Sequence, residues 1–296
     1  MYKNPVIQRL CNPLHESRGI IADVLRLDLV HPVISGNKWF KLKYYLDNAS
    51  KLNYHGIVSF GGAYSNHLLA LAYACREKNI RSAAIIRGES DGHNNSTLAD
   101  MKALGMEMHF VSREKYRDKI SLAETFRETH PEYLVVPEGG QGEEGIKGAA
   151  EILTDVPRHY THIICSVGTG TTLAGIISAS HDNQQVIGIS ALKVEDEKNN
   201  ELLRFLQEHT NKKNYQLLFQ FHFGGYARRN KELINFMNEY FNREKIPTDF
   251  VYTAKMFYAV EELIRTNYFP SGSHLLLIHT GGLQGNRSLA EGELLF

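Results

Sequence analysis

A glycine- and threonine-rich segment has the clearest capacity for chemistry in this sequence. SVGTGTTLAG (166–175) follows an apolar run and opens a helical pattern. Its glycines allow backbone amides to converge and its threonines add hydroxyl donors, which together suit a phosphate group. A nucleotide P-loop is excluded because no lysine follows the glycines, and the third small position of a dinucleotide fingerprint falls on Leu173. The segment therefore predicts a monophosphate site, with a plain structural turn as the alternative. Its candidate residues are Gly168, Thr169, Gly170, Thr171 and Thr172.

A lysine near the start of the chain is the second candidate. The segment GNKWFKLKYYLDNA (36–49) predicts a helix whose first turn Asn37 can cap. Lys38 and Lys41 are three residues apart and share a face, whereas Lys43 points elsewhere. Apolar surroundings depress the pKa of a lysine amine. Such an amine together with a phosphate site indicates a Schiff base with pyridoxal phosphate, and a solvated lysine is the alternative.

The elements that must position these residues alternate between strand and helix. Short apolar runs ending in glycine or polar turns precede longer helical stretches, which indicates parallel sheet with helical crossovers. The predicted strands cover 55–62, 82–88, 106–112, 133–140, 161–168, 186–192 and 274–282. So many strands favour an α/β fold with two lobes and a cleft between them. We expect a small domain, 47–149, set into a large domain formed by 1–46 and 150–296.

Composition excludes several other classes of protein. The 33 Lys and Arg residues balance the 33 Asp and Glu residues, so nothing in the charge favours nucleic acid or an anionic membrane as a partner. No apolar run reaches the roughly 18–20 residues of a membrane span. The three cysteines are widely spaced, which favours a reducing cytoplasmic location. No HExxH motif or Cys/His cluster is present, so we expect no catalytic metal.

Six segments carry a resemblance to a known family. They are SGNKWFKLKYYLDNA, SFGGAYSNHLLALA, CSVGTGTTLAG, GGYARRNKEL, VYTAKMFYA and HTGGLQG. In this order they resemble motifs of the 1-aminocyclopropane-1-carboxylate deaminase and D-cysteine desulfhydrase family, from about residue 25 to the C-terminus. The resemblance implies a pyridoxal 5'-phosphate enzyme of the tryptophan synthase β-like fold, called fold type II. It also implies a homodimer that acts on a small amino acid.

The resemblance implies a role for each matching residue. Lys38 matches the lysine that binds the cofactor aldehyde and moves substrate protons, and Lys41 matches a lysine beside the phosphate. The turn that holds the substrate carboxylate is matched by Ser65, Asn66 and His67. Asn66 also matches the partner of the cofactor 3-oxygen, although it is compatible with a plain helix cap. Residues 168–172 match the phosphate loop. Two tyrosines that face the substrate and the ring are matched by Tyr226 and Tyr252, whereas His67 replaces a glutamine of the deaminases.

Two threonines indicate a branch of this family. The cyclopropane deaminases carry glutamate and leucine where this chain has Thr253 and Thr280, whereas desulfhydrase-like members carry small hydroxyl residues. A neutral hydroxyl does not keep the pyridine nitrogen protonated, so the ring is a weaker electron sink. That favours β-elimination of a good leaving group, with Lys38 or Ser65 removing the α-proton. The alternatives are cyclopropane deamination, another fold type II dehydratase or racemase, and cofactor binding without catalysis.

Two other residues are expected to have structural roles. His279 is expected to satisfy a hydrogen bond at a strand end, with action as a base as the alternative. Cys165 is expected to be a buried, unreactive thiol because it sits in an apolar strand.

Overall fold

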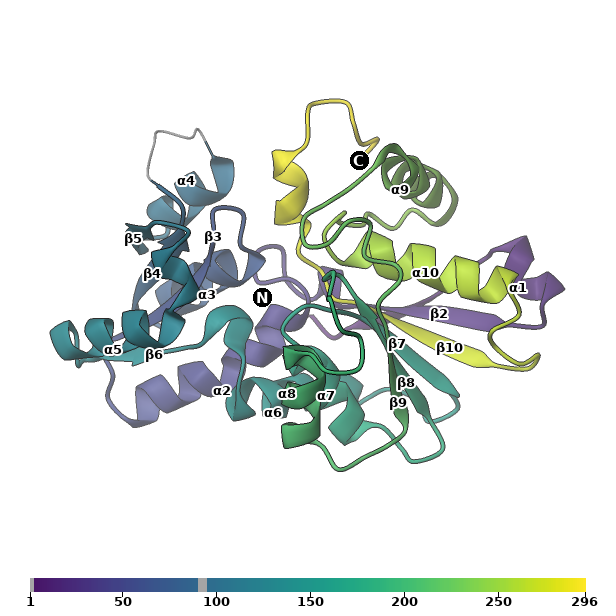
Figure 1. Ribbon diagram of the computed structural model, residues 1–296, viewed down its shortest axis with the longest axis horizontal. Helices are drawn as coiled ribbons and strands as arrows, with labels where there is room; N and C mark the ends of the chain where they lie inside the picture. The colour runs from purple at the N-terminus through teal and green to yellow at the C-terminus, as the bar shows by residue number, and fades with distance from the viewer. Residues whose placement is uncertain (1–2, 90–94) are drawn as a thin grey trace.

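Two mainly parallel β-sheets, each with helices on both faces, form two adjoining lobes (Figure 1). The structure is a computed structural model that describes residues 3–89 and 95–296. Within these ranges the larger sheet has the order β1-β2-β10-β7-β8-β9 and the smaller one the order β5-β4-β3-β6. The predicted α/β class is thereby confirmed. No helix of the described ranges has the length and apolar character needed to cross a membrane.

The larger sheet is buried on both faces. Its strands are β1 (Val6–Arg9), β2 (Ile21–Arg26), β10 (His274–His279), β7 (His162–Val167), β8 (Gln185–Ser190) and β9 (Tyr215–Leu218). β1 is antiparallel to β2, and the other described pairs are parallel. Along β7, Ile163 and Cys165 belong to one apolar core and Ile164 to the other. This alternation explains why the strand reads as a continuous apolar run.

Helices cover the larger sheet in two groups. One face carries α2 (Asn37–Lys51), α6 (Glu143–Ala150), α7 (Thr171–Ala179) and α8 (Glu201–His209). The other carries α1 (Pro13–Ser17), α9 (Lys231–Glu244) and α10 (Thr253–Arg265), as Figure 1 shows. Helix α2 joins the lobes, because Phe40 packs into the core of the larger lobe and Leu42 and Leu46 into that of the smaller one.

The smaller sheet consists of β5 (Glu107–Val111), β4 (Arg81–Arg87), β3 (Gly56–Gly62) and β6 (Tyr133–Val135). Helices α3 (Asn66–Glu77) and α4 (Ser96–Ala103) pack on one face with α2, and α5 (Lys119–Thr129) packs on the other. These strands lie inside the predicted small domain, 47–149, whose boundaries remain a prediction. The 3-10 helices are η1 (Leu27–Leu29), η2 (Lys115–Arg117), η3 (Glu138–Gly140), η4 (Glu151–Leu153) and η5 (Leu283–Ser288).

Each of the seven predicted strand runs contains a strand, whereas β1, β2 and β9 were not predicted. β2 is central and buried, but Asp23 and Arg26 interrupt its apolar pattern. Both are buried with partners: Asp23 accepts a hydrogen bond from Tyr160 Oη at 2.9 Å, and Arg26 donates to Asp28. A polar residue inside a strand is tolerated when such partners satisfy it, and a pattern of hydropathy does not reveal them.

Candidate active site

A cavity of about 640 Å³ opens between the two sheets. Its walls come from the carboxyl ends of β3 and β4, the β7–α7 turn, the start of α2 and the segment after β10. Ligands of parallel sheets bind at this edge, where helix N-termini present unpaired amides. The cavity contains twelve of the sequence-predicted residues in its lining: Lys38, Lys41, Ser65, Asn66, His67, Gly168, Thr169, Gly170, Thr172, Tyr226, Tyr252 and Thr280.

Asn37 connects Lys38 to the threonine-rich turn. Lys38 Nζ donates to Asn37 Oδ1 at 3.0 Å, and Asn37 Nδ2 donates to Thr172 Oγ1 at 2.7 Å. The predicted capping role of Asn37 is wrong: Gly36 occupies the cap position, with φ of 71°, and the Asn37 side chain points across the cavity instead. Burial lowers the pKa of Lys38 to about 8, and the Asp249 carboxylate opposes this shift. A substantial fraction of this amine is therefore neutral and nucleophilic near physiological pH.

Lys41 lies one turn further along α2 and is buried beside the same turn. Burial, and then the neighbouring Lys38 cation, lower the pKa of Lys41 well below its usual value. A β-carbon built on Gly139 would lie 3.9 Å from Lys41 Nζ and 3.1 Å from Thr169 Cγ2, so amine and threonine approach the same backbone. Lys43 instead points outward and pairs with Glu151 at 2.6 Å, as the spacing predicted.

The β7–α7 turn follows a strand and opens a helix, as its sequence indicates. Gly170 adopts the left-handed conformation with φ of 86°, and α7 begins at the next residue. Thr169 Oγ1 and Thr171 Oγ1 share a hydrogen bond of 3.1 Å. Thr171 itself is buried and lies behind the residues that line the cavity. The amides at the start of α7 are free of intrahelical acceptors, and the helix dipole favours an anion there.

The β3–α3 turn supplies a second set of donors. Ser65 caps α3 by accepting from the Leu68 amide at 3.2 Å. Asn66 Nδ2 donates to the Gly282 carbonyl at 2.9 Å, whereas its buried Oδ1 has no partner. A buried amide oxygen without a donor is costly, so this atom faces a place for a ligand.

His67 is held in one tautomer by the network around Ser59. The Ser59 hydroxyl donates to the Val136 carbonyl at 2.8 Å, so it accepts from His67 Nε2, also at 2.8 Å. The proton assigned to Nε2 leaves Nδ1 as an acceptor, and this buried atom has no partner. Burial, then the Lys38 and Lys41 cations, lower the pKa of His67 well below its usual value. His67 is therefore a neutral imidazole in this structure.

These features together fit a phosphate ester that carries an aldehyde. Lys41 is buried and Lys38 is half-buried, and no carboxylate of the described residues lies within ion-pair distance of either amine. The phosphate would lie against the β7–α7 turn near Lys41, and the aldehyde would lie near Lys38. The unpartnered Asn66 Oδ1 shows where a further polar group fits.

Comparison with known proteins decides the family. The sequence pattern of the family described as "Pyridoxal-phosphate dependent enzyme" matches residues 12–281. The chain belongs to this family of enzymes. Among its relatives is a "Putative 1-aminocyclopropane-1-carboxylate deaminase" of Thermotoga maritima, 31% identical, with the match covering 92% of each chain. At this level of similarity the chain is also a member of the 1-aminocyclopropane-1-carboxylate deaminase and D-cysteine desulfhydrase family.

Further matches agree with this placement. A bifunctional D-cysteine desulfhydrase/1-aminocyclopropane-1-carboxylate deaminase of Arabidopsis thaliana is 26% identical, with the match covering 88% of this chain and 72% of the other. A crystal structure of a protein described as the ACC deaminase homologue superposes with a TM-score of 0.81 at 24% identity, covering 96% of this chain and 91% of the other. The structural match confirms the predicted fold type II architecture of this pyridoxal-phosphate dependent enzyme.

Two tyrosines of the enzyme, Tyr226 and Tyr252, line the cavity. The rings of Tyr226 and Tyr252 lie 6.0 Å apart at 65°. Burial raises the pKa of both phenols, far above the usual value for Tyr252. Both hydroxyls therefore keep their protons at neutral pH and are available as donors toward the cavity.

The two predicted threonines lie in different environments. Thr280 lines the cavity, and its hydroxyl shares a hydrogen bond of 3.1 Å with Ser166. Thr253 is fully buried outside the lining, with its hydroxyl donating to Asp249 Oδ2 at 2.7 Å. A direct contact between Thr253 and the cofactor therefore stays a prediction, while Thr280 and Ser166 are the hydroxyls exposed to a ligand.

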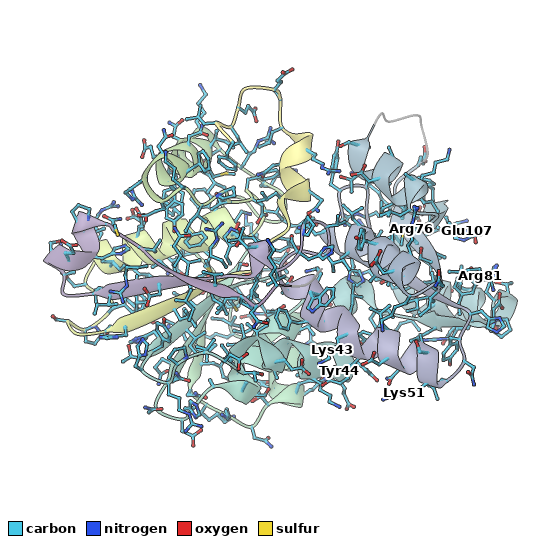
Figure 2. The ribbon with its side chains drawn as sticks, turned by 180° about the vertical axis from the view of Figure 1, so that it is seen from behind. Lys43, Tyr44, Lys51, Arg76, Arg81 and Glu107 are labelled. Carbon is cyan, nitrogen blue, oxygen red and sulfur yellow. The ribbon has the colours of Figure 1, made fainter. Side chains whose placement is uncertain are left out.

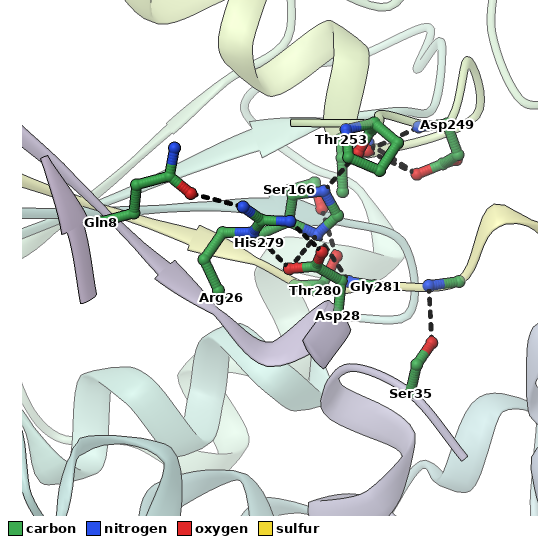
Figure 3. A network of polar contacts seen from close by, with 12 residues as sticks. Gln8, Arg26, Asp28, Ser35, Ser166, Asp249, Thr253, His279, Thr280 and Gly281 are labelled. Atoms are coloured by element: carbon green, nitrogen blue, oxygen red, sulfur yellow. Dashed lines mark hydrogen bonds and ion pairs between the residues drawn. The ribbon is translucent and has the colours of Figure 1, made fainter. Parts of the chain in front are cut away.

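A chain of buried polar groups supports the segment after β10 (Figure 3). The Arg26 guanidinium donates to Asp28 with both Nε and Nη2, at 2.8 and 2.6 Å, and Asp28 Oδ1 lies 3.5 Å from His279 Nδ1. His279 Nε2 donates to the Pro247 carbonyl at 2.8 Å, so Nδ1 accepts from the Gly281 amide at 3.1 Å. This structural role of His279 is the one predicted.

Several supporting residues escaped the sequence analysis. Arg26 and Asp28 are polar residues at the end of an unrecognised strand, and Ser166 lies within an apolar one. Asp249 lies three residues before Tyr252, the N-cap of α10, so the usual N-cap pattern does not indicate it. The prediction for Cys165 is confirmed, because it is fully buried and burial raises the pKa of its thiol to about 12. No group of three or more metal-ligating side chains occurs within the described ranges.

Proposed function

We propose that the enzyme catalyses α,β-elimination from a small β-substituted amino acid, giving a keto acid, ammonia and the released β-substituent. With D-cysteine the products would be pyruvate, ammonia and sulfide. The supporting observation is the polar environment of Thr280, whose partner is the neutral hydroxyl of Ser166. In the described chain, the carboxylates lining the cavity are Glu138, which is paired with Lys119, and Glu201 at the start of α8.

In the proposed elimination, the cofactor and the protein supply different groups. Pyridoxal phosphate supplies an aldehyde that binds the substrate amine and a ring that withdraws electrons from the α-carbon. Lys38 is the group that accepts the α-proton, because its pKa of about 8 leaves a basic amine that is partly neutral near physiological pH. Asn37 fixes the position of this amine through its 3.0 Å hydrogen bond.

The β3–α3 turn is the expected seat of the substrate carboxylate. Ser65, Asn66 and His67, at the start of α3, line the cavity, and a helix N-terminus favours negative charge. Ser65 Oγ accepts from the Leu68 amide, which leaves its own proton available for a carboxylate oxygen. Holding the carboxylate here and the proton acceptor on α2 would fix the α-carbon between them, and such positioning lowers the barrier.

The tyrosine pair is suited to the departing β-substituent. Tyr226 and Tyr252 retain their protons at neutral pH because burial raises the pKa of each phenol. A protonated phenol can donate a hydrogen bond to a leaving group as it gains negative charge. We assign the tyrosines this role, with Tyr226 nearer the solvent because this residue is 48% exposed.

Ring opening of 1-aminocyclopropane-1-carboxylate is the second candidate, favoured by the name of the 31% identical relative. Breaking an unactivated carbon–carbon bond needs a stronger electron sink than expelling a thiolate. A carboxylate beside the ring nitrogen would strengthen the sink by holding a proton there. The Thr280–Ser166 pair does not provide that charge, which is why elimination is the preferred proposal.

The deciding experiment is an assay of the purified holoenzyme with D-cysteine, L-cysteine and 1-aminocyclopropane-1-carboxylate. We expect sulfide and pyruvate from a cysteine enantiomer and little 2-oxobutanoate from the cyclopropane. Lys38→Ala should abolish turnover, whereas Lys43→Ala, on the outward face of the same helix, should not. Dominant release of 2-oxobutanoate would replace the proposal by its alternative. Size-exclusion chromatography tests the homodimer that the family resemblance implies.

A further inference from the structure

Arg87 is a cation of the cavity that the proposed chemistry does not use. It is the last residue of β4 and lies opposite Gly62 of β3 in the parallel register. A β-carbon built on Gly62 would lie 3.6 Å from Arg87 Nη2, so the guanidinium extends across the end of β3. Arg87 is solvent-exposed, and it lines the cavity together with the β3–α3 turn.

The arginine at the other end of the same strand provides a direct comparison. Arg81, the first residue of β4, lies over the Tyr133 ring at 5.0 Å and forms an ion pair with Glu132 at 3.2 Å. Figure 2 shows Arg81 with Arg76 and Glu107 at the outer part of the smaller lobe, away from the larger one. Arg87 lies over the Tyr116 ring at 5.7 Å, but none of the described carboxylates is within ion-pair distance of it. Within residues 3–89 and 95–296 its charge therefore faces the cavity without a counter-ion.

Neighbouring charges do not neutralise this part of the wall. Glu138 forms its ion pair with Lys119 at 2.6 Å, and Arg127 on α5 adds a further exposed cation to the lining. The Arg87 cation acts on Tyr226, opposing the effect of burial on the pKa of that phenol. The guanidinium and the tyrosine assigned to the leaving group both belong to residues that line the cavity.

We propose that Arg87 selects substrates whose β-substituent ends in an anionic group, with a carboxylate as the best match. A guanidinium binds a carboxylate through two parallel hydrogen bonds, which gives both affinity and orientation. The α-carboxylate has its own donors in the β3–α3 turn, so Arg87 is available for the distal end of the substrate. This inference rests on the proposed function for the reaction that follows binding.

A pair of esters with the same leaving-group chemistry tests the selection. O-Succinylserine and O-acetylserine differ by a distal carboxylate, and both enantiomers of each would be assayed with the holoenzyme. We expect wild-type kcat/KM to be about 10- to 100-fold higher for the succinyl ester, the range of one charge-assisted contact. Arg87→Gln should reduce this ratio to near one, and Arg87→Lys should restore part of it. Arg81→Gln is the matched control and should keep the wild-type ratio.

A binding measurement makes the test independent of turnover. Calorimetry would compare glutamate with its neutral isostere glutamine, in both enantiomers, on wild-type and Arg87→Gln holoenzyme. Tighter binding of one glutamate enantiomer by wild type only would support the inference even if no ester is cleaved, in which case the proposed function alone fails. An equal loss of affinity for glutamate and glutamine in Arg87→Gln would mean that Arg87 binds the α-carboxylate, and would overturn the inference. So would an absence of any preference for glutamate in the wild type.

Discussion

Thr253 and Asp249 form a closed hydrogen-bonded pair at the start of α10. The Thr253 hydroxyl donates to Asp249 Oδ2 at 2.7 Å, and the Asp249 amide donates to Thr253 Oγ1 at 2.8 Å. The same carboxylate accepts from the amides of Val251, Tyr252 and Thr253. The Thr253 hydroxyl is thus hydrogen-bonded within the protein. Together with Asp249 it stabilises the start of α10, where Tyr252 is the N-cap residue.

Removing this hydroxyl should affect stability more than cofactor binding. For Thr253→Val we expect the free energy of unfolding to fall by about 1–2 kcal/mol, because the buried Asp249 carboxylate loses a donor and the Asp249 amide loses its acceptor. Cofactor affinity should change less than threefold, since the side chain does not line the cavity. Thr280→Val, whose hydroxyl faces the cavity, should show the opposite pattern. Urea unfolding measures the free energy of unfolding, and a spectroscopic titration measures the cofactor affinity. A large loss of cofactor affinity in Thr253→Val alone would show that Thr253 contacts the cofactor.

A glycine after β10 should be needed for the position of Asn66. Gly282 has φ of 82°, and a β-carbon there would lie 2.2 Å from Asn66 Nδ2. Gly292 has nearly the same φ, 83°, with nothing within 4 Å. Both Gly→Ala variants have a similar backbone cost of about 1–2 kcal/mol. Gly292→Ala is therefore the control, and any additional effect of Gly282→Ala comes from the clash with Asn66. We expect Gly282→Ala to weaken cofactor binding at least tenfold and Gly292→Ala to leave it unchanged. Equal affinities would disprove the role assigned to this contact.

Lys41 should discriminate in favour of a phosphorylated cofactor. Its buried amine has a pKa well below the usual value, and a phosphate dianion would restore the charged form. Lys41→Met should therefore weaken binding of pyridoxal phosphate by about 10- to 100-fold, the range of a charge-assisted contact. Binding of pyridoxal, which lacks the phosphate, should hardly change. The ratio of the two dissociation constants is the measurement, and a parallel loss for both ligands would place Lys41 away from the phosphate.

The sequence was sufficient to predict the positions of those site residues that are recognised by residue type and spacing. Lys38 and Lys41 share a face of α2, and the threonine-rich turn closes the same cavity, because helical periodicity and strand–turn–helix order are local properties. The side chain of Asn37 shows the limit. An asparagine at this position favours a local helix cap. Its side-chain amide instead donates a hydrogen bond to Thr172, 135 positions away. Such a choice depends on how the start of α2 packs beside the start of α7, which no local pattern contains.

Buried polar networks are the other part that sequence did not reveal. Arg26 and Asp28 look like surface charges in the sequence, yet both are almost fully buried and bonded to each other beneath His279. Lys255 is a similar case. It belongs to the segment VYTAKMFYA, but the sequence analysis gave it no role of its own. It is fully buried, and its amine donates to the Gly225 carbonyl at 2.8 Å, next to Tyr226. The partners of these groups are distant in sequence, so burial with compensation is visible only in the fold.

Lys255 should give the protein a measurable pH dependence of stability. Burial lowers the pKa of this amine to about 8, and the Asp249 carboxylate opposes the shift. Between pH 8 and the unfolded pKa of roughly 10.4, the unfolded chain keeps a proton that the folded chain has released. Stability contributed by this group therefore rises with pH, by up to about 1.4 kcal/mol for each pH unit in that window.

Lys255→Met removes the titrating group, so comparison with wild type isolates its contribution. The difference in free energy of unfolding, wild type minus variant, should be constant below about pH 7.5 and increase toward pH 10 by on the order of 2 kcal/mol. Lys245→Met is a suitable control because Lys245 ends α9 in an exposed position with no buried amine to titrate. Urea unfolding at several pH values measures the difference. A difference that stays flat up to pH 10 would mean that the folded protein keeps this proton, because the Gly225 and Ala191 carbonyls hold the ammonium more strongly than burial opposes it.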